Sequence, residues 1–401
     1  MVPAGVSDRT RPAPSRGLPL PVLALTKSTG GLASYHRTLV QGLSPAEFAI
    51  HTICLSDNAA AFAADLAALG HSAESLEMAR YRIDPLGDLR VAGRVARVAR
   101  ARGVRVILAH GAKAGVIARA VGALLRVPVV ECQASLPFLP RVQGRRARVY
   151  RLLLRAARVL GGHVVALSES ARHESLAAGI VAADRITVIR SGIDTARFAP
   201  AGRRVAMRHA LGVPPDAPLL LWLGRLERQK APEVFLDLAE RLTARLPKLQ
   251  VVIAGSGSLG QGLADRIAAS PARGRLRLLP WQADPAALLE AGDVLCLSSR
   301  WEGLPLSLLE AMAMGLVPVA TAVDGVVEVI EDGISGRLVP PGDPAALEAA
   351  LAEVLSDPPR RAELAAGAVQ RVAQAFTARR MLDDWRRTLQ ALASGRAPGC
   401  G

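Results

Sequence analysis

The stretch VLCLSSRWEGLPLSLLEAMAMGLVPVATA, residues 294–322, contains a short apolar run, a loop, a helical segment and a second apolar run. The two apolar runs begin at Val294 and Val317 and are continuous, which is typical of parallel strands that are covered on both faces. Pro305 suits the first position of the helix between them, because a missing N–H costs nothing there. The stretch therefore predicts a β–α–β unit in a parallel sheet.

The same alternation extends in both directions from this unit. Further strand-like runs begin at Pro21, Ala49, Val104, Val127, His163, Pro218, Gln250, Arg275 and Gly336, with helical patterns between them. A proline-rich break at 193–218 separates two series of runs, and 358–393 has only a helical pattern. Repeated β–α order predicts α/β doubly wound sheets, whose ligands bind outside the carboxyl ends of the strands.

We therefore predict two Rossmann-like domains that face a central cleft. The expected segments are a disordered N-terminus at 1–17, a domain at 18–192, a second domain at 193–375, and a helical tail at 376–396 that returns to the first domain.

Composition narrows the class of protein. Half of the 401 residues are apolar and 21% are charged, which excludes a largely disordered chain. No charge-free apolar run approaches the ~18 residues of a membrane-spanning helix. Residues 1–16 lack an apolar leader, so we expect a cytosolic chain. Cys54, Cys132 and Cys296 lie in apolar runs and form no C-x-x-C pair, which indicates buried thiols rather than zinc ligands or disulfides.

The positive charge is concentrated in the first half. Residues 1–200 contain 27 Lys and Arg against 13 Asp and Glu, whereas residues 201–401 contain 23 against 22. The partner of the basic half should be anionic: a nucleic acid, a membrane surface or a phosphorylated substrate. Aromatic residues make up only 3% of the chain, so base-stacking platforms are scarce and nucleic acid is disfavoured.

Two arginine-rich segments carry much of this charge. Residues 141–158 contain seven arginines and no acid, interleaved with leucines, and residues 90–105 contain six arginines. Such a helix can lie on an anionic bilayer, although a solvated basic face would have the same composition. We expect contact with an anionic membrane surface.

The segment around the helix at Pro305 carries candidate binding groups. The first backbone N–H groups of this helix, at Leu306 and Ser307, can receive a phosphate. Glu310 lies one turn further on and can accept bonds from both hydroxyls of a ribose, while Glu302 stands just ahead of the helix. The alternative is a capped helix with two solvated acids.

A second candidate is the loop in WLGRLERQKAP, residues 222–232. A buried strand ends at Gly224, and Arg225 and Lys230 follow it. Two cations at the carboxyl end of a strand suit a diphosphate, although a pair of surface charges is the simpler alternative. The chain has no D-x-D sequence, so protein cations and a helix N-terminus, rather than a metal, are expected to neutralise a leaving diphosphate.

Glycine-rich turns offer two more candidates. Gly30 and Gly31 separate the first strand from its helix and would let a ligand approach the backbone, unless they form a plain turn. GSGSLG, residues 255–260, matches G-x-G-x-x-G, the dinucleotide motif of oxidoreductases. That motif expects an acid about 20 residues later, where this chain has Arg-Leu-Arg at 275–277.

Taken in order, these motifs resemble those of the retaining glycosyltransferases of family 4, which have the GT-B fold, over about residues 20–390. The most specific element is the E-x7-E pair Glu302 and Glu310. Supporting elements are the GR…QK loop, the AGSG turn from Ala254, the SGID segment from Ser191 and VDGVVEVIEDGISGRLVPPGD from Val323.

The resemblance implies residue roles by position. Arg225, Lys230 and Glu302 would be the catalytic residues, with the two cations on the diphosphate and Glu302 at the sugar. The donor-binding set would be Glu310, Gly303, Leu304, Leu306, Ser307, Trp281, Gln282 and Gly255. The acceptor and phosphate side would hold Gly30, Gly31, His110 and Gln133.

The chain departs from the family pattern at three places. Gln133 stands where the family commonly has a histidine, and glutamine cannot take up a proton. Ser191-Gly192 replaces Asn-Gly, and Asp324-Gly325 replaces paired glycines. A catalytically silent nucleotide-sugar-binding scaffold therefore stays open beside the dinucleotide oxidoreductase; a GT-B-type epimerase has no support from the E-x7-E pair.

We expect a retaining, metal-independent glycosyltransferase that needs no cofactor. Its substrates would be a nucleotide-sugar donor and a lipid-linked or membrane-anchored glycan acceptor in bacterial surface polysaccharide biosynthesis. We expect it in the cytoplasm, peripheral on the inner face of the cell membrane, without nucleic acid.

Overall fold

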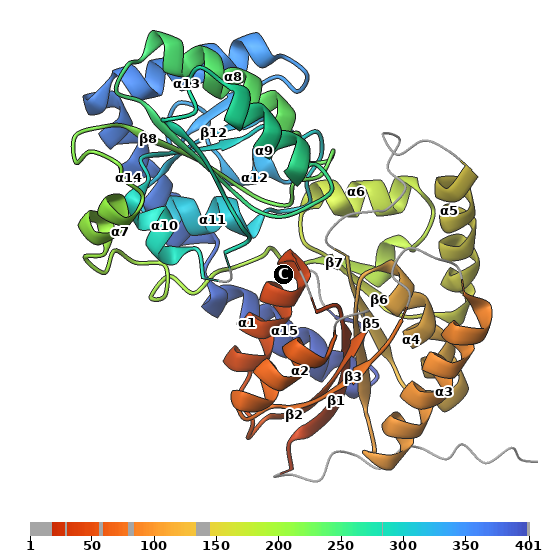
Figure 1. Cartoon of the computed structure of the whole chain (residues 1–401). Coiled ribbons are helices and arrows are strands. Elements are labelled where there is room, and N and C mark those ends of the chain that lie inside the picture. Colours follow the sequence, from red (N-terminus) through yellow and green to blue (C-terminus); the bar gives the residue numbers. More distant parts are fainter. Residues whose placement is uncertain are drawn as a thin grey trace, which may run out of the picture.

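The computed structural model describes residues 18–28, 30–55, 59–78, 84–133, 145–282 and 284–398. The predicted disordered segment 1–17 and residues 141–144 of the basic segment lie outside the described residues. The described chain forms two α/β domains, stacked one above the other in Figure 1.

The N-terminal domain contains a seven-stranded parallel sheet in the order β3-β2-β1-β4-β5-β6-β7. Its strands are β1 (Leu20–Thr26), β2 (Phe48–Leu55), β3 (Ser72–Leu76), β4 (Val106–His110), β5 (Val129–Gln133), β6 (His163–Ala166) and β7 (Ile186–Val188). Its helices are α1 (Gly31–Gly42), α2 (Ala59–Ala68), α3 (Pro85–Ala101), α4 (Ala112–Leu125), α5 (Arg145–Ala157) and α6 (Glu169–Ala177), with 3₁₀ turns at Arg158–Leu160 and Ala183–Arg185.

The C-terminal domain contains a six-stranded parallel sheet in the order β10-β9-β8-β11-β12-β13. Its strands are β8 (Leu219–Leu223), β9 (Gln250–Ala254), β10 (Leu276–Leu279), β11 (Val294–Leu297), β12 (Val317–Thr321) and β13 (Arg337–Val339). The remaining helices are α7 (Arg204–Ala210), α8 (Pro232–Arg245), α9 (Gly260–Ala269), α10 (Ala286–Ala291), α11 (Leu306–Ala313), α12 (Val326–Val329), α13 (Pro344–Ser356), α14 (Pro358–Ala375) and α15 (Ala378–Ala393).

The predicted fold class is confirmed, and the differences from the prediction are local. Strands β3 and β7 were not expected, because β3 is a polar edge strand with exposed residues and β7 has only three residues. Pro305 is the N-cap of α11 in an extended conformation, and the helix begins one residue later, at Leu306. The prediction that Pro305 takes the first helical position is therefore wrong by one residue.

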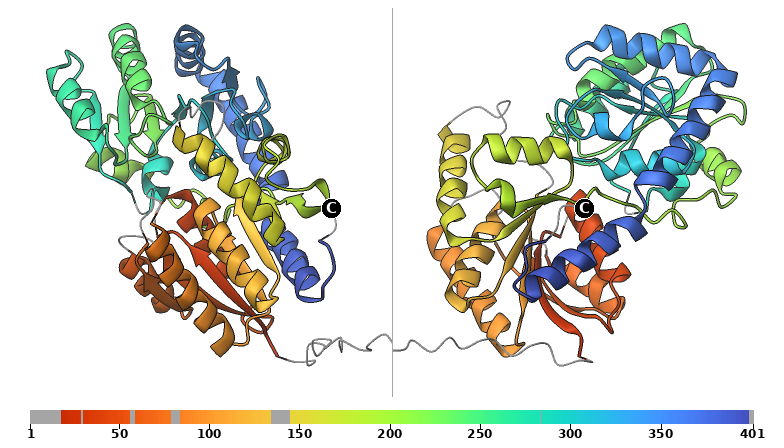
Figure 2. Two further views of the ribbon diagram at one scale, coloured as in Figure 1. Left: turned by 90° about the vertical axis from the view of Figure 1, so that its right-hand side faces the viewer. Right: turned by 180° about the vertical axis from the view of Figure 1, so that it is seen from behind.

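Helix α15 packs on the N-terminal domain although it ends the chain. Its buried residues Met381, Trp385 and Leu389 share a core with β1, β4 and α1, while α3 and α4 cover the other face of the sheet. The indole N–H of Trp385 donates to the Tyr35 hydroxyl at 2.6 Å. Figure 2 shows α15 lying along the N-terminal sheet when the molecule is seen from behind.

The two segments that cross between the domains are joined to each other. Ile193 N–H donates to the Phe376 carbonyl at 2.9 Å, and Ala378 N–H donates to the Ile193 carbonyl at 2.7 Å. Gly192 makes this approach possible, because a Cβ there would lie 2.2 Å from the Thr377 carbonyl oxygen. The glycine of the SGID segment thus has a packing role between the domains.

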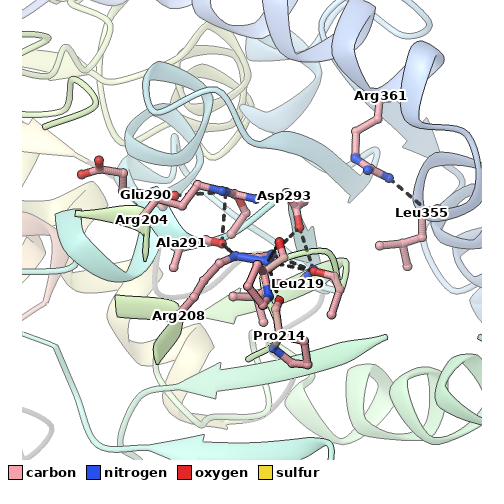
Figure 3. Close-up of polar contacts among 12 residues, drawn as sticks. Arg204, Arg208, Pro214, Leu219, Glu290, Ala291, Asp293, Leu355 and Arg361 are labelled. Carbon is pink, nitrogen blue, oxygen red and sulfur yellow. Dashed lines mark hydrogen bonds and ion pairs between the residues drawn. The ribbon is translucent and has the colours of Figure 1, made fainter. Parts of the chain in front are cut away.

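Helix α7 follows the first of the two segments that cross between the domains. Two of its arginines, Arg204 and Arg208, fix it to the rest of the C-terminal domain (Figure 3). Arg208 is buried and donates to the carbonyls of Ala217 and Ala291 and to the Asp293 carboxylate. Arg204 donates to the other oxygen of Asp293 at 2.6 Å. These hydrogen bonds and the ion pair with Asp293 offset the loss of hydration of the buried Arg208 guanidinium.

Cys54, Cys132 and Cys296 are free and buried, which confirms the predicted buried thiols. No helix among the described residues is long and apolar enough to cross a membrane.

Candidate active site

A cleft of about 900 Å³ lies between the two domains. Its walls include the loops that follow β1, β8 and β11, so the carboxyl ends of strands from both sheets open into it. This is the place where open α/β sheets bind ligands.

Most of the candidate residues come together on this cleft. Those that line it are Arg225, Lys230, Trp281, Gln282, Glu302, Gly303, Leu304, Leu306, Ser307, Glu310, Gly30 and Gly31.

Lys230 and Glu302 form an ion pair at the cleft wall, with both side chains largely buried. The same Glu302 oxygen accepts a hydrogen bond from the Ser299 hydroxyl at 2.6 Å. Ser298 holds the other side of the pair, since its hydroxyl donates to the carbonyls of Lys230 and Ala231. The two residues predicted to contact diphosphate and sugar therefore also contact each other.

Gln229 links Arg225 to the loop that carries Glu302. Its side-chain oxygen accepts from the Arg225 guanidinium at 2.6 Å, and its amide donates to the Trp301 carbonyl at 3.0 Å. Gln229 also lines the cleft. The sequence analysis missed this residue, although the Q of the GR…QK loop was the signal that marked it.

Asp324 was noted only as a departure from the family pattern, yet it fixes the backbone of Glu302. Its carboxylate accepts from the Glu302 N–H at 2.8 Å, and its own φ is +40°. Gly325 packs directly on this loop, because a Cβ there would lie 2.0 Å from the Gly303 carbonyl oxygen. The Asp-Gly pair thus combines a hydrogen-bond acceptor with a close backbone approach.

The N-terminus of α11 and the carboxylate of Glu310 both face the cleft. No side chain caps α11, so its first N–H groups, at Leu306 and Ser307, are available to an anion. Burial raises the pKa of Glu310 to about 7, with the nearby positive charge of Arg197 opposing this effect. A carboxyl group that titrates near neutrality can accept or donate hydrogen bonds to paired hydroxyls.

Trp281 and Gln282 form the rim of the cleft after β10. The Trp281 side chain is 50% exposed, and the backbone N–H of Trp281 donates to the Ser256 hydroxyl at 3.2 Å. Gln282 folds back to donate to the Pro280 carbonyl at 2.9 Å. An exposed indole at a cleft rim can stack on a planar ring.

The N-terminal wall is made by two helices. Gly30 is the N-cap of α1 with φ +77°, and neither Gly30 nor Gly31 has a neighbour that an added Cβ would meet. The sequence analysis missed the other lining residues here, among them Lys27 and Arg37, and Arg379, Leu382 and Arg386 of α15. The α15 residues could not be assigned because they lie about 350 positions from α1 in the sequence.

His110 does not lie on the cleft, in contrast to the prediction. It is fully buried at the end of β4, and its ring pairs with His36 at 3.1 Å. Burial lowers its pKa to about 3, so the ring is neutral at physiological pH.

Gln133 is also turned away from the cleft. Its amide donates to Glu131 at 2.8 Å, and its oxygen accepts from the Ser175 hydroxyl at 3.0 Å. Glu131 in turn pairs with the buried Arg119 at 3.0 Å. The side chain of Gln133 is therefore used in a buried network.

Gly255 lies beneath the Arg225 loop rather than on the cleft. A Cβ at Gly255 would lie 1.9 Å from the Gly224 carbonyl oxygen, and one at Gly257 would lie 2.4 Å from that of Leu226. The chain's own loop 224–226 thus occupies the space over the glycines of GSGSLG. This packing accounts for the motif without a dinucleotide.

Among the residues that the structure describes, no three His, Cys, Asp or Glu side chains gather as metal ligands would. Whether catalysis needs a metal stays a prediction.

Two families match the chain, one in each domain. The family described as Glycosyltransferase Family 4 matches residues 29–197, and the family described as Glycosyl transferases group 1 matches residues 204–371.

Curated relatives match about half of the chain. The D-inositol 3-phosphate glycosyltransferase of Thermobispora bispora is 35% identical over 221 residues, which cover 52% of this chain and 51% of the relative. That of Geodermatophilus obscurus is 40% identical over 221 residues, or 52% and 46% of the two chains. The chain thus spans about half the length of the curated relatives it matches.

Solved structures share the fold over nearly the whole chain. The Anabaena protein HepE, solved with UDP-glucose, superposes with a TM-score of 0.80 at 22% identity, covering 93% of this chain and 100% of HepE. The sucrose-phosphate synthase of Thermosynechococcus elongatus has a TM-score of 0.78 at 19% identity, covering 94% and 100%.

One glycosyltransferase family model therefore matches each domain, and the solved structures share the two-domain GT-B fold of the chain.

Proposed function

We propose that the protein is a retaining glycosyltransferase that uses a nucleotide-sugar donor and needs no metal. The observation that carries the proposal is the C-terminal wall of the cleft, where Arg225, Lys230, the uncapped N-terminus of α11 and Glu310 face one space. Two cations and a helix N-terminus suit a diphosphate, and a carboxyl group one turn further on suits a ribose. HepE, which shares the fold, was solved with UDP-glucose.

The chemistry requires no nucleophile from the protein. The bond between the sugar C1 and the diphosphate oxygen breaks, a bond from C1 to the acceptor oxygen forms on the same face, and the acceptor proton passes to the departing diphosphate. Arg225, Lys230 and the N-terminus of α11 stabilise the charge that develops on the diphosphate. Glu302, released from Lys230 when the diphosphate binds, is then free to contact the sugar.

The proposed acceptor is a lipid-linked or membrane-anchored glycan used in bacterial surface polysaccharide biosynthesis. A neighbour with a TM-score of 0.67, the lipopolysaccharide outer core galactosyltransferase WaaB, supports a glycan acceptor. A phosphorylated cyclitol is the second candidate, because the relatives at 35–40% identity are named D-inositol 3-phosphate glycosyltransferases.

We place the protein in the cytoplasm, at the inner face of the membrane. Helix α5 and the 3₁₀ turn after it expose Leu152, Leu153 and Val159 beside the exposed arginines Arg148 and Arg151. Exposed apolar side chains flanked by arginines suit an anionic lipid surface.

The donor is tested by thermal unfolding against UDP-, GDP- and ADP-sugars. A ligand at 100 times its dissociation constant adds about 2.7 kcal/mol to the free energy of unfolding, which raises the melting temperature measurably. The preferred donor should then be turned over in EDTA, with the anomeric configuration of the product retained by NMR. Loss of turnover in EDTA that Mg²⁺ restores would contradict the metal-free mechanism.

Membrane contact is tested by vesicle sedimentation. The protein should pellet with anionic vesicles at low salt, remain soluble with neutral vesicles, and be released at high salt. Arg148→Glu with Arg151→Glu should reduce pelleting, since each arginine contributes about 1 kcal/mol near such a surface. Arg241→Glu with Arg245→Glu, on α8 of the other domain, is the matched control. An equal loss of pelleting in both double variants would show that α5 does not make the membrane contact.

A further inference from the structure

Trp301, the residue directly before Glu302, reaches from the C-terminal domain into the N-terminal domain. Its half-buried ring packs against an apolar cluster formed by Leu154, Ile180, Ala112, Val116 and Ala178. These residues come from α4, α5 and the segment directly after α6. The ring is therefore an apolar contact between the two domains at the edge of the cleft.

The backbone at Trp301 is tied to the groups that face the cleft. Its carbonyl accepts from Gln229, which also binds the Arg225 guanidinium. The next residue, Glu302, pairs with Lys230. A shift of the Trp301 backbone would thus be transmitted to both cations and to Glu302.

A second contact between the domains lies one strand further on. Glu328 of α12 accepts from the Ser170 N–H in the first turn of α6 at 3.0 Å, and from Arg190 at 3.2 Å. A carboxylate at a helix N-terminus is favoured by the helix dipole. Figure 1 shows α6 at the boundary between the domains. Ser170 lies in this helix and Ala178 directly follows it, so the Glu328 contact and Trp301 engage the same part of the N-terminal domain.

We infer that Trp301 is a positioning residue that links closure of the two domains to the placement of Arg225, Lys230 and Glu302. While the Trp301 ring packs against Leu154 and Ile180, the N-terminal domain holds the loop 300–302 in place. When the domains separate, the ring loses its apolar partners, and the N-terminal domain no longer holds the loop in place. The inference rests on the proposed function, because the placed groups are those assigned to the donor.

The test compares Trp301→Ala, Trp301→Phe and Leu154→Ala with the matched control Leu124→Ala, whose side chain is 68% exposed on α4, the helix that also carries Ala112 and Val116. The readouts are the kcat of donor hydrolysis, the Kd of the nucleoside diphosphate, and the radius of gyration with that diphosphate bound.

Trp301→Ala should lower kcat by roughly 10- to 100-fold, because a misplacement of about 1 Å has that effect, while the Kd changes by less than about threefold. Trp301→Phe should restore most of the rate. Leu154→Ala should lower kcat although it touches no donor group, and the double variant should be no slower than Trp301→Ala alone. Leu124→Ala should keep the wild-type rate.

The radius of gyration should increase in Trp301→Ala and Leu154→Ala. Because Leu154→Ala removes a buried side chain, Glu328→Gln serves as a second variant that loosens the same closure from the other contact. A wild-type kcat and radius of gyration in folded Trp301→Ala would overturn the inference. So would an equal loss of kcat in Leu124→Ala.

Failure of the proposed function would be recognised separately. In that case wild-type protein would bind no nucleoside diphosphate and hydrolyse no nucleotide sugar. The radius of gyration of the ligand-free variants would still decide whether Trp301 holds the domains together, with an unchanged value overturning that contact.

Discussion

The two walls of the cleft are built in different ways. On the C-terminal side, the charged residues follow directly after β8 and β11, and contacts between neighbouring loops hold them in place. On the N-terminal side, the residues that end β4 and β5 are His110 and Gln133, and both turn into buried networks. The N-terminal wall includes one face each of α1 and α15, together with Lys27 and Gly30 of the loop after β1.

The difference shows under which conditions a residue at the end of a strand becomes part of the site. Gly255, Gly257 and Gly325 let the C-terminal loops lie directly on each other, because a Cβ at each would lie 1.9–2.4 Å from a backbone carbonyl oxygen of the neighbouring loop. In the N-terminal domain, His36 of α1 and Ser175 of α6 instead offer the strand-end residues buried partners. Variants on the two sides of the cleft test this contrast.

The largest effect is expected on the C-terminal wall. Arg225→Ala and Lys230→Ala should each lower donor turnover by about 10²–10³, the usual loss when one group that stabilises developing charge is removed. Lys248→Ala is the matched control, because Lys248 is an exposed lysine of the same domain that pairs only with Asp216. Steady-state rates with the preferred donor measure the effect. Losses of turnover of less than about threefold would indicate that the diphosphate does not bind at Arg225 and Lys230.

Substitutions of the two glutamates of the E-x7-E pair should have different effects on turnover and on diphosphate affinity. Glu302→Gln should lower turnover while free diphosphate binds at least as well, because Lys230 loses its competing partner. Glu310→Gln should weaken the diphosphate about tenfold, which corresponds to about 1.4 kcal/mol for the altered hydrogen bonds to the ribose. Calorimetry on both variants decides this, and an equal loss of diphosphate affinity would contradict the division of roles.

Glu310 should make binding depend on pH. Its pKa is raised to about 7 in the ligand-free protein, and ribose hydroxyls that donate to it would favour the ionised form. Nucleotide binding should therefore release a proton and strengthen between pH 6 and pH 8, by up to about tenfold for a bound-state shift of one unit. Titrations in buffers of different ionisation enthalpy measure the release. Glu310→Gln, which should retain only the titration of the phosphate, is the control.

The same shift has a consequence for stability. A carboxyl whose pKa is raised on folding stabilises the ligand-free protein fully below its unfolded pKa, and this contribution is lost as the pH rises from about 4.5 to about 7. Glu310→Gln should therefore gain stability over the wild type at pH 8 and lose that advantage near pH 4.5.

The smallest effect on turnover is expected at His110. His110→Leu should change turnover by less than about threefold, because the ring does not line the cleft. It should lower the free energy of unfolding by about 1–3 kcal/mol, since the buried His36 loses a partner. A loss of turnover like that of Lys230→Ala would show that His110 reaches the substrate.

Acid stability gives an independent check on this buried ring. The pKa of His110 is depressed to about 3, so its contribution to stability is present above the unfolded pKa of about 6.5 and decreases as the pH falls below it. Urea unfolding at pH 7 and pH 5 should show a smaller loss in His110→Leu than in the wild type.

Much of the architecture was predictable from continuous apolar runs. All six strands of the C-terminal sheet and five of the seven N-terminal strands follow such runs. Strand β3 did not, because an edge strand needs no apolar face on its open side.

The candidate site was predictable where residue type and local backbone act together. Arg225, Lys230 and Glu302 lie within seven residues after a strand end, Glu310 lies on the helix after β11, and the structure brings all four to one wall. Gln229 and Asp324 were missed as positioning residues because their roles depend on a partner in another loop. Arg379 was missed because only tertiary packing brings α15 to the cleft.

The central claim is that a nucleoside diphosphate binds the C-terminal wall of the cleft. Calorimetric titration of the diphosphate of the preferred donor into wild type, Lys230→Ala and Lys248→Ala tests it most directly. We predict a single site in the wild type, about 10- to 100-fold weaker in Lys230→Ala through the loss of a charged hydrogen bond, and unchanged in Lys248→Ala. No binding to the wild type, or equal affinity in Lys230→Ala and the wild type, would contradict the account.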